Sequence, residues 1–167
     1  DVSQIKASEE HIEFLAHHDP LTRLPNRVML FSRLEHLMGA IRREGGLIAL
    51  LMIDLDRFKD VNESYGHVLG DELLQQVSER LKSQLRGTDS LARLGGDEFT
   101  ILLEDVEHPG DAGRVAGDVL AALADSWRLA NGAEVRVGAS IGIALYPGPA
   151  ETPEDLLRQA DAALYRA

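Results

Sequence analysis

Residues 47–53 read LIALLMI, an unbroken apolar run between a pair of glycines and the acidic triplet DLD at residues 54–56. A short continuous apolar run bounded by turn-forming residues is typical of a strand buried on both faces of a sheet. We therefore predict a central strand here, with Asp54 and Asp56 at its carboxyl end.

Weaker patterns on either side complete the fold. Apolar residues recur at helical spacing in five segments. These predicted helices span residues 1–18, 26–44, 73–85 and 115–123, and the stretch that begins at the N-cap Thr152. Residues 90–94 and 99–103 flank GGDE as the arms of a hairpin, and residues 135–145 alternate like a strand whose small-residue face a helix approaches closely. This order predicts an α+β fold in which helices cover a sheet.

The first predicted helix has a thin apolar seam. Ile5, Ile12 and Leu15 stand at heptad-like spacing along it. Two interpretations of the seam remain open from the pattern. The helix either packs on the domain as a terminal helix, or is the end of a coiled coil that arrives from an upstream module.

The composition excludes several kinds of protein. The chain has 167 residues, 44% hydrophobic and 27% charged, which is typical of a folded domain with one core. It has no cysteine, and therefore no disulfide, thiolate metal site or cysteine nucleophile. Its 17 basic and 28 acidic residues give a net charge of −11, which repels phosphate backbones and anionic lipids. We expect no nucleic-acid partner and no direct membrane contact, and we expect divalent cations to mediate binding of any phosphorylated ligand.

Acidic residues stand directly after the predicted central strand. Carboxylate oxygens at the mouth of a rigid strand suit a hard cation such as Mg²⁺, which keeps coordination positions open for substrate phosphates. A lone Asp-x-Asp, however, more often only ends a strand and caps the next turn. Asp54 and Asp56 by themselves therefore do not establish a metal site.

A second acidic pair, Asp97 and Glu98, falls in the predicted hairpin turn. The preceding Gly95 and Gly96 permit a tight bend and the close approach of a phosphate or a base. A plain solvated turn explains this pair alone equally well. Two acidic clusters on neighbouring strands change the balance, because crowded carboxylates repel one another unless a cation is bound.

The polar segment at residues 62–71 reads NESYGHVLGD. An amide and a carboxylate together can read a guanine edge, so Asn62 and Asp71 are candidates for base recognition. Alternatively, Asp71 caps the following helix and Asn62 lies in a turn. His67 alone is more often a structural hydrogen-bonding residue, and Lys59 can meet either a phosphate or solvent.

Five ordered motifs in the chain resemble those of one family. Residues 95–99 spell GGDEF, the signature of the GGDEF domain family, the diguanylate cyclases. The others resemble the family's D-P-L-T-x-L-x-N-R, D-x-D-x-F-K, N-x-x-x-G-H-x-x-G-D-x-L-L and A-D-x-A-L-Y-x-A, and stand at residues 19–27, 54–59, 62–74 and 160–167. The resemblance implies a central, mostly antiparallel sheet flanked by helices, related to nucleotide cyclases and polymerase palms. It also implies a catalytic domain at residues 19–167, preceded by a signalling or linker helix at residues 1–18.

The resemblance also implies a reaction and roles for individual residues. Two GTP would be joined into cyclic di-GMP with release of two pyrophosphates. Asp54 and Asp97, with the Leu55 carbonyl, would hold Mg²⁺ or Mn²⁺. Asp97 and Glu98 would assist deprotonation of the attacking 3′-hydroxyl, and Lys59 would stabilise phosphate charge. The implied substrate-binding residues are Phe58, Asn62, His67, Asp71, Gly95 and Gly96.

Arg86 and Asp89 match the family's R-x-x-D inhibitory site for the product. An Arg can bind a guanine edge or a phosphate with two hydrogen bonds, and an Asp can accept from guanine N–H groups. The alternative is a local salt bridge at a helix end, which contributes little. Because cyclic di-GMP is two-fold symmetric and one site holds one GTP, we expect the active state to be a homodimer.

One departure from the family pattern concerns the end of the chain. Family members usually follow the closing motif with a lysine and an arginine that contact phosphates, and this chain stops at Ala167 before both. We therefore expect a truncated tail and weaker GTP binding. We expect a cytoplasmic domain, or the cytoplasmic part of a larger, membrane-anchored signalling protein.

Two other functions compete with the cyclase. One is a catalytically weak or silent module that binds GTP or cyclic di-GMP to regulate a partner phosphodiesterase domain. The other is a different two-metal nucleotidyl enzyme, such as a mononucleotide cyclase. The presence of Asp54, Lys59, Asp97 and Glu98 argues against a silent module.

Overall fold

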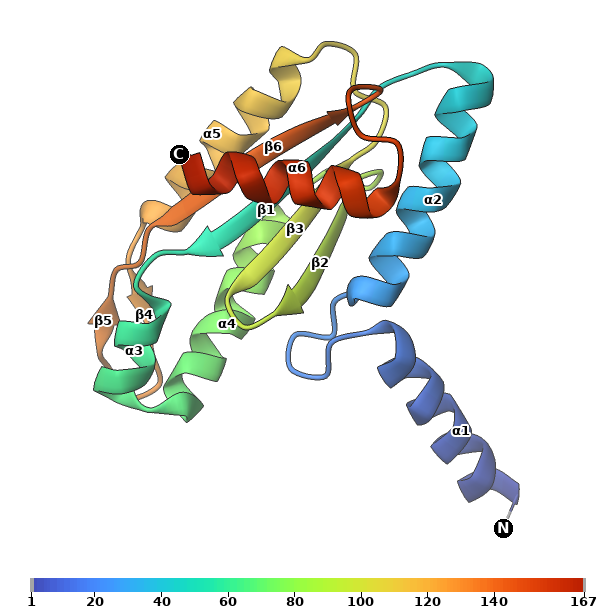
Figure 1. Cartoon of the computed structure of the whole chain (residues 1–167). Coiled ribbons are helices and arrows are strands. Elements are labelled where there is room, and N and C mark those ends of the chain that lie inside the picture. Colours follow the sequence, from blue (N-terminus) through green and yellow to red (C-terminus); the bar gives the residue numbers. More distant parts are fainter. Residues whose placement is uncertain (1, 167) are drawn as a thin grey trace.

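The structure, a computed structural model, describes residues 2–166 and the side chains of residues 2–164. Figure 1 shows a sheet with helices packed on both faces and one helix that projects from the body. The helices are α1 (Val2–His17), α2 (Arg27–Glu44), α3 (Phe58–Tyr65), α4 (His67–Ser83), α5 (Gly110–Ala124) and α6 (Pro153–Arg166). The strands are β1 (Ile48–Leu55), β2 (Ser90–Gly95), β3 (Glu98–Leu103), β4 (Trp127–Arg128), β5 (Glu134–Val135) and β6 (Ala139–Tyr146).

The main sheet has the strand order β2-β3-β1-β6, and every neighbouring pair in it is antiparallel. The apolar run predicted as a central strand is β1, and its residues 48–53 are all buried. The register places Asp54 opposite Glu98 on one side and opposite Ser140 on the other. The fold prediction is therefore confirmed, and the carboxyl end of β1 lies beside the β2–β3 turn.

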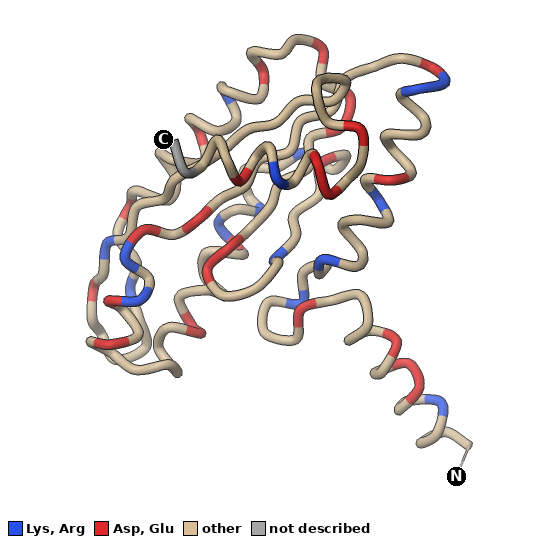
Figure 2. The backbone as a smooth tube through the Cα atoms, viewed as in Figure 1, with Lys and Arg blue, Asp and Glu red and all other residues tan. Residues whose placement is uncertain are grey.

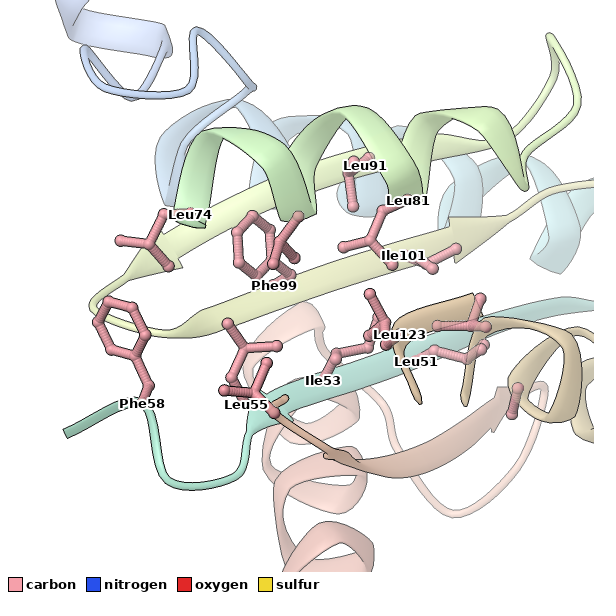
Figure 3. Packing of buried hydrophobic residues seen from close by; sticks show 14 of the residues in the cluster. Leu51, Ile53, Leu55, Phe58, Leu74, Leu81, Leu91, Phe99, Ile101 and Leu123 are labelled. Atoms are coloured by element: carbon pink, nitrogen blue, oxygen red, sulfur yellow. The ribbon is translucent and has the colours of Figure 1, made fainter. Parts of the chain in front are cut away.

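Alternation along β1 divides the core into two layers. One layer, between the sheet and α4 and α5, contains Leu51 and Ile53 of β1 together with Phe99 and Ile101 of β3 (Figure 3). The other layer, between the sheet and α2 and α6, contains Leu50 and Met52. Asp54 continues the second series, so its side chain belongs to the face that α2 and α6 cover.

Local signals set the ends of several helices as predicted. Asn26 caps α2 through its side-chain oxygen, which accepts from Met29 N at 3.2 Å. Thr152 caps α6 in the same manner, accepting from Asp155 N at 3.1 Å. Gly142 on β6 confirms the predicted close approach of a helix, because an added Cβ would overlap the backbone of α6.

Three predictions about elements were wrong. Helix α3 was not predicted, and the helix predicted from residue 73 begins at His67. The single strand predicted over residues 135–145 is divided into β5, which pairs with β4 in a separate two-stranded ribbon, and β6. The alternating pattern is the same in both parts, so it could not show that the chain changes partners between them.

Helix α1 projects away from the body (Figure 1). None of its described side chains is buried, and Ile5 and Ile12 are 59% and 68% exposed. The interpretation of a terminal helix packed on the domain is therefore wrong, and the apolar seam is open. In the part of the chain that the structure describes, no helix is long and apolar enough to cross a membrane.

Candidate active site

The fold brings the two acidic clusters together at one end of the sheet. Asp54 is the penultimate residue of β1, Glu98 is the first residue of β3, and Asp97 precedes Glu98 in the turn. The Leu55 N–H donates to the Asp97 carbonyl at 3.3 Å, which ties the turn to the end of β1. Figure 2 shows acidic residues, in red, on the backbone at this end of the sheet and on most other elements. The predicted convergence of Asp54, Asp97 and Glu98 is what the structure shows.

The surroundings of Asp54 disfavour its charge. Burial, and then the adjacent Asp97 carboxyl, raise the pKa of Asp54 from 3.8 to about 7, and Glu98 and Asp56 add to the effect. Two carboxylates this close cannot both ionise without cost unless a cation compensates them. The pair thus has the donor chemistry of a site for a hard divalent cation.

A backbone carbonyl completes this donor set. The N–H of the Leu55–Asp56 peptide donates to the Gly138 carbonyl on the β6 side, at 2.9 Å. Because N–H and C=O point in opposite directions across a trans peptide, the Leu55 carbonyl points to the other side, where Asp97 lies. Within the described residues no three His, Asp or Glu side chains form a metal-binding group. The groups that could hold a cation here are the carboxylates of Asp54 and Asp97 and the Leu55 carbonyl.

Glu98 borders a cleft between the sheet, α2 and α6. The cleft, of about 460 Å³, is lined by apolar residues that include Phe31 and Met52 and by charged residues. Burial raises the pKa of Glu98, and Asp161 and Asp97 raise it further, whereas Arg27 opposes the shift. Glu98 is thus poised to take up a proton more readily than an ordinary glutamate.

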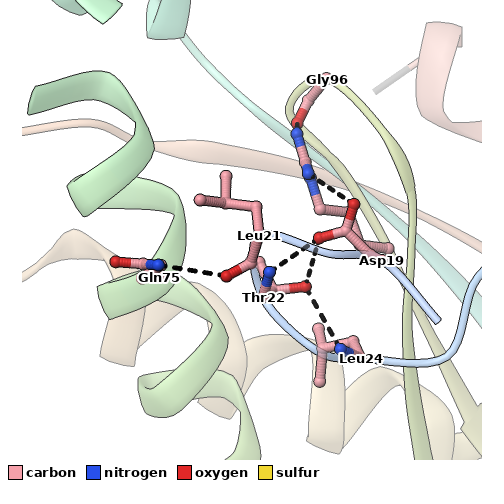
Figure 4. A network of polar contacts seen from close by, with 7 residues as sticks. Asp19, Leu21, Thr22, Leu24, Gln75 and Gly96 are labelled. Atoms are coloured by element: carbon pink, nitrogen blue, oxygen red, sulfur yellow. Dashed lines mark hydrogen bonds and ion pairs between the residues drawn. The ribbon is translucent and has the colours of Figure 1, made fainter. Parts of the chain in front are cut away.

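A nearly buried ion pair connects the turn to the loop after α1 (Figure 4). Arg93 on β2 donates through Nε and Nη2 to the Gly96 carbonyl, at 3.0 and 2.8 Å, and through Nη1 to Asp19 Oδ1 at 2.8 Å. The other oxygen of Asp19 accepts from the Thr22 backbone and hydroxyl. Although burial raises the pKa of Asp19, these hydrogen bonds and the charge of Arg93 outweigh it and keep the pKa below its usual value. The loop after α1 is thereby connected to the turn that carries Asp97.

The residues predicted to read guanine lie on two consecutive helices. Asn62 is on α3, and its Oδ1 is buried without a hydrogen-bond partner in the structure. That oxygen lies against Gly70 of α4, where an added Cβ would overlap it. Asp71 follows Gly70 on α4 rather than capping the helix, and both Asp71 and His67 are exposed. Of these three residues, Asp71 and His67 are thus open to a ligand, whereas the Asn62 oxygen is covered by Gly70.

Two other predicted site residues, Lys59 and Phe58, do not lie in the acidic cluster of Asp54, Asp97 and Glu98. Lys59 is 87% exposed and lies 3.8 Å from Glu63, so it is paired within α3. The side chain of Phe58 is buried in the core beside Leu55 and Leu74 (Figure 3). Because this side chain is enclosed, a contact of Phe58 with substrate has to involve its backbone, and its part in substrate binding stays a prediction. Gly95 ends β2 and Gly96 stands in the turn, with φ values of 150° and 47°.

Arg86 and Asp89 form a separate site beyond the end of α4. Their side chains lie 3.5 Å apart, and Asp89 Oδ2 also accepts from the Arg86 N–H at 3.0 Å. The second oxygen of Asp89 is buried and has no partner in the structure. The pair lines a cavity of about 480 Å³ to which Lys82 also contributes.

Several residues of the site were not identified from sequence. Arg93 and Asp19 are 74 positions apart, and no local pattern connects them. Arg27 and Asp161, which act on Glu98, stand inside the opening and closing motifs and could have been considered there. Their role depends on how α2 and α6 pack on the sheet, which is a tertiary property.

The antiparallel sheet with acidic residues at the end of its central strand is the palm-like fold of nucleotide cyclases. The chain matches the family "Diguanylate cyclase, GGDEF domain" over residues 16–167. It therefore belongs to the GGDEF domain family, as the sequence motifs predicted.

Relatives with known names agree with this assignment. The chain is 47% identical over 165 residues to the bifunctional diguanylate cyclase/cyclic di-GMP phosphodiesterase MucR of Pseudomonas aeruginosa, covering 99% of this chain and 24% of MucR. The solved GGDEF domain of TpbB from P. aeruginosa superposes with a TM-score of 0.87 at 44% identity, covering 90% of this chain and 88% of that one. The GGDEF domain of DgcB from Caulobacter crescentus, solved in complex with c-di-GMP, has a TM-score of 0.83 at 25% identity, covering 90% and 89%. The chain thus spans about a quarter of the length of MucR.

Proposed function

We propose that this domain is a diguanylate cyclase that condenses two GTP into cyclic di-GMP and releases two pyrophosphates. The observation that carries the proposal is the Asp54–Asp97 pair, whose crowded carboxylates suit a divalent cation at the end of β1. The names of the relatives support the same reaction.

Asp54, Asp97 and the Leu55 carbonyl would hold Mg²⁺ or Mn²⁺. The ion would supply positive charge where the phosphates bind, which an acidic domain cannot otherwise provide. Glu98, with its raised pKa, accepts the proton of the attacking 3′-hydroxyl, and Asp97 orients that hydroxyl. Lys59 leaves its weak, exposed pair with Glu63 to meet the phosphates.

Specificity for guanine rests on Asn62 and Asp71. The Asn62 amide faces guanine O6 or N7, and the exposed Asp71 carboxylate accepts from guanine N1–H and N2–H₂. Adenine would leave these polar groups unpaired, and a site built for such hydrogen bonds rejects the analogue that lacks them. ATP should therefore be a poor substrate.

The experiment that tests this function is product analysis. Incubation of the domain with GTP and Mg²⁺, followed by chromatographic separation of nucleotides, should give cyclic di-GMP, and ATP in a parallel reaction should remain unconverted. Cyclic GMP as the main product would identify a mononucleotide cyclase instead. Bound but unconverted GTP would support the silent regulatory module.

The cavity at Arg86 and Asp89 favours a second, regulatory function for the same domain. Two cations, Lys82 and Arg86, and a buried oxygen of Asp89 without a partner line it. This combination suits a ligand with phosphates and a guanine edge. The proposal is that cyclic di-GMP binds here and holds domains in arrangements in which two active sites cannot meet.

Substitution Arg86→Ala should relieve inhibition by the product. The measurement is the rate with added cyclic di-GMP divided by the rate without it, for wild type and variant. Arg114→Ala is a matched control, because Arg114 on α5 also pairs with an aspartate three positions away in sequence, Asp111. Equal inhibition of the Arg86 variant and wild type would contradict the regulatory proposal.

A further inference from the structure

A second carboxylate at the end of β1 has no part in the proposed chemistry. The Asp56 side chain accepts a hydrogen bond from Ser140 Oγ at 3.0 Å. Its backbone N–H donates to the Gly138 carbonyl at 2.9 Å. Asp56 is therefore attached to the start of β6 by both backbone and side chain.

The start of β6 is shaped to receive this carboxylate. A Cβ on Gly138 would lie only 3.2 Å from Asp56 Oδ2, so the absence of a side chain there keeps room for Asp56. Ser140 stands directly opposite Asp54 in the register, yet its hydroxyl donates to Asp56. The two aspartates thus have different surroundings. The Asp54 carboxyl lies beside that of Asp97, whereas the Asp56 carboxylate is held by the hydrogen bond from Ser140.

These hydrogen bonds hold the Leu55–Asp56 peptide, whose carbonyl would face the cation. The N–H of the Leu55–Asp56 peptide bonds to Gly138, and this sets the direction of the Leu55 carbonyl toward Asp97. One hydrogen bond near the end of a strand leaves that peptide able to rotate when the strand frays. The side-chain bond from Ser140 to Asp56 adds a second attachment on the same side.

We propose that Asp56 and Ser140 are positioning residues that hold the Leu55 carbonyl toward the Asp54–Asp97 pair. The proposal rests on the proposed function in that it assigns these three groups to a divalent cation. Outer partners that fix the direction of ligands commonly change metal affinity by 10- to 100-fold when they are removed.

The test is direct binding of Mn²⁺ to the domain without GTP, followed through the EPR signal of the free ion. Ser140→Ala removes the hydrogen bond without changing the charge, and it should weaken Mn²⁺ binding roughly tenfold. Ser140→Thr keeps the hydroxyl and should restore binding. Asp56→Ala should be at least as weak as Ser140→Ala. Thermal melts without metal confirm that each variant is folded.

A matched control removes the same kind of bond elsewhere. Ser126 donates to Glu134 at 3.0 Å in a surface contact beside the β4–β5 ribbon, and Ser126→Ala should bind Mn²⁺ like wild type. Wild-type affinity in a folded Ser140→Ala variant would overturn the proposal. Loss of binding in Asp56→Ala with normal binding in Ser140→Ala would also overturn it, because Asp56 would then be a ligand.

The binding assay separates this inference from the proposed function. If the wild-type domain binds Mn²⁺ and makes no cyclic di-GMP, the function fails while the order of affinities still tests the positioning. If wild type makes cyclic di-GMP and all variants bind Mn²⁺ equally, the function stands and the positioning role fails.

Discussion

Burial and the neighbouring carboxylates disfavour the charged form of Asp54, and this leads to a prediction about how stability depends on pH. Its pKa in the folded domain is about 7, against 3.8 for an ordinary aspartate. As the pH rises through this window, the unfolded chain ionises Asp54 first, so the free energy of unfolding falls. Without metal, wild type should therefore lose stability between about pH 4 and pH 7 relative to a variant that cannot ionise there.

The variant Asp54→Asn tests this sign. Solvent screening at this half-exposed site limits the effect, so we expect a gain of roughly 1 kcal/mol at pH 8, or about 2–4 °C in Tm, and a smaller gain at pH 5. Mg²⁺ should stabilise wild type and leave the variant unchanged, and turnover should be lost. Thermal melts in chelator and in Mg²⁺ at both pH values measure this. A difference that does not grow with pH would contradict the repulsion between Asp54 and Asp97.

Gly70 gives a second prediction at the residue scale. Replacing a helical glycine by alanine usually stabilises a helix by about 1 kcal/mol. At Gly70, however, the new methyl group would displace the Asn62 amide, so Gly70→Ala should raise the KM for GTP. Gly117 on α5 has nothing within 4 Å of its Cβ position, which makes Gly117→Ala the control. An unchanged KM for GTP in the Gly70 variant would contradict a role of Asn62 in guanine recognition.

At the scale of elements, the ion pair between Arg93 and Asp19 connects β2 to the loop after α1. Both side chains are nearly buried, at 12% and 13% exposure. Removing Arg93 leaves Asp19 without its counter-charge and the Gly96 carbonyl without two donors, so Arg93→Ala should cost about 3 kcal/mol and lower kcat.

The control for this prediction is the more exposed pair of Arg33 and Glu104, in which Arg33 is 48% exposed. Arg33→Ala should cost less than about 1 kcal/mol and leave kcat unchanged. Urea unfolding and initial rates measure both variants. Equal effects of the two substitutions would show that the Arg93 pair has no special part in holding the turn.

The elements that sequence predicted well are those with strong local signals. The apolar run of β1, the glycine turn of the hairpin and the Thr152 cap of α6 each depend on residues close together in the chain. Helix α3 was not predicted because only two of its eight residues, Phe58 and Val61, are buried, which is too few to form a helical apolar pattern. The convergence of Asp54 and Asp97 was predictable because strand β1 and the hairpin were both clear. The contact of Arg93 with Asp19, and that of Ser140 with Asp56, follow only from the way the sheet is assembled.

At the scale of the whole molecule, one copy of the site cannot complete the proposed product. Cyclic di-GMP has two-fold symmetry, so two domains must present their GTP to each other. The specific activity of the isolated domain should therefore rise with protein concentration. A specific activity that is constant over a hundredfold range down to nanomolar protein would contradict a transient encounter.

Helix α1 adds to this prediction. Its exposed seam of Ile5, Ile12 and Leu15 has the spacing of a coiled coil, and a parallel pair of such helices would raise the frequency of the encounter. Replacing Ile5 and Ile12 by serine should shift the rise in specific activity to higher protein concentration. The domain fold should be unaffected, because both side chains are exposed. An unchanged concentration dependence would assign the seam no role in this encounter.

The central claim is that carboxylates at the end of β1 support the joining of two GTP in a symmetric pair of domains. The most direct test is to measure pyrophosphate and nucleotide product in the same reaction, for wild type and Asp54→Asn. The wild-type domain should release two pyrophosphates for each cyclic di-GMP, and the variant should release none above background. One pyrophosphate for each cyclic mononucleotide, or full activity in the variant, would contradict it.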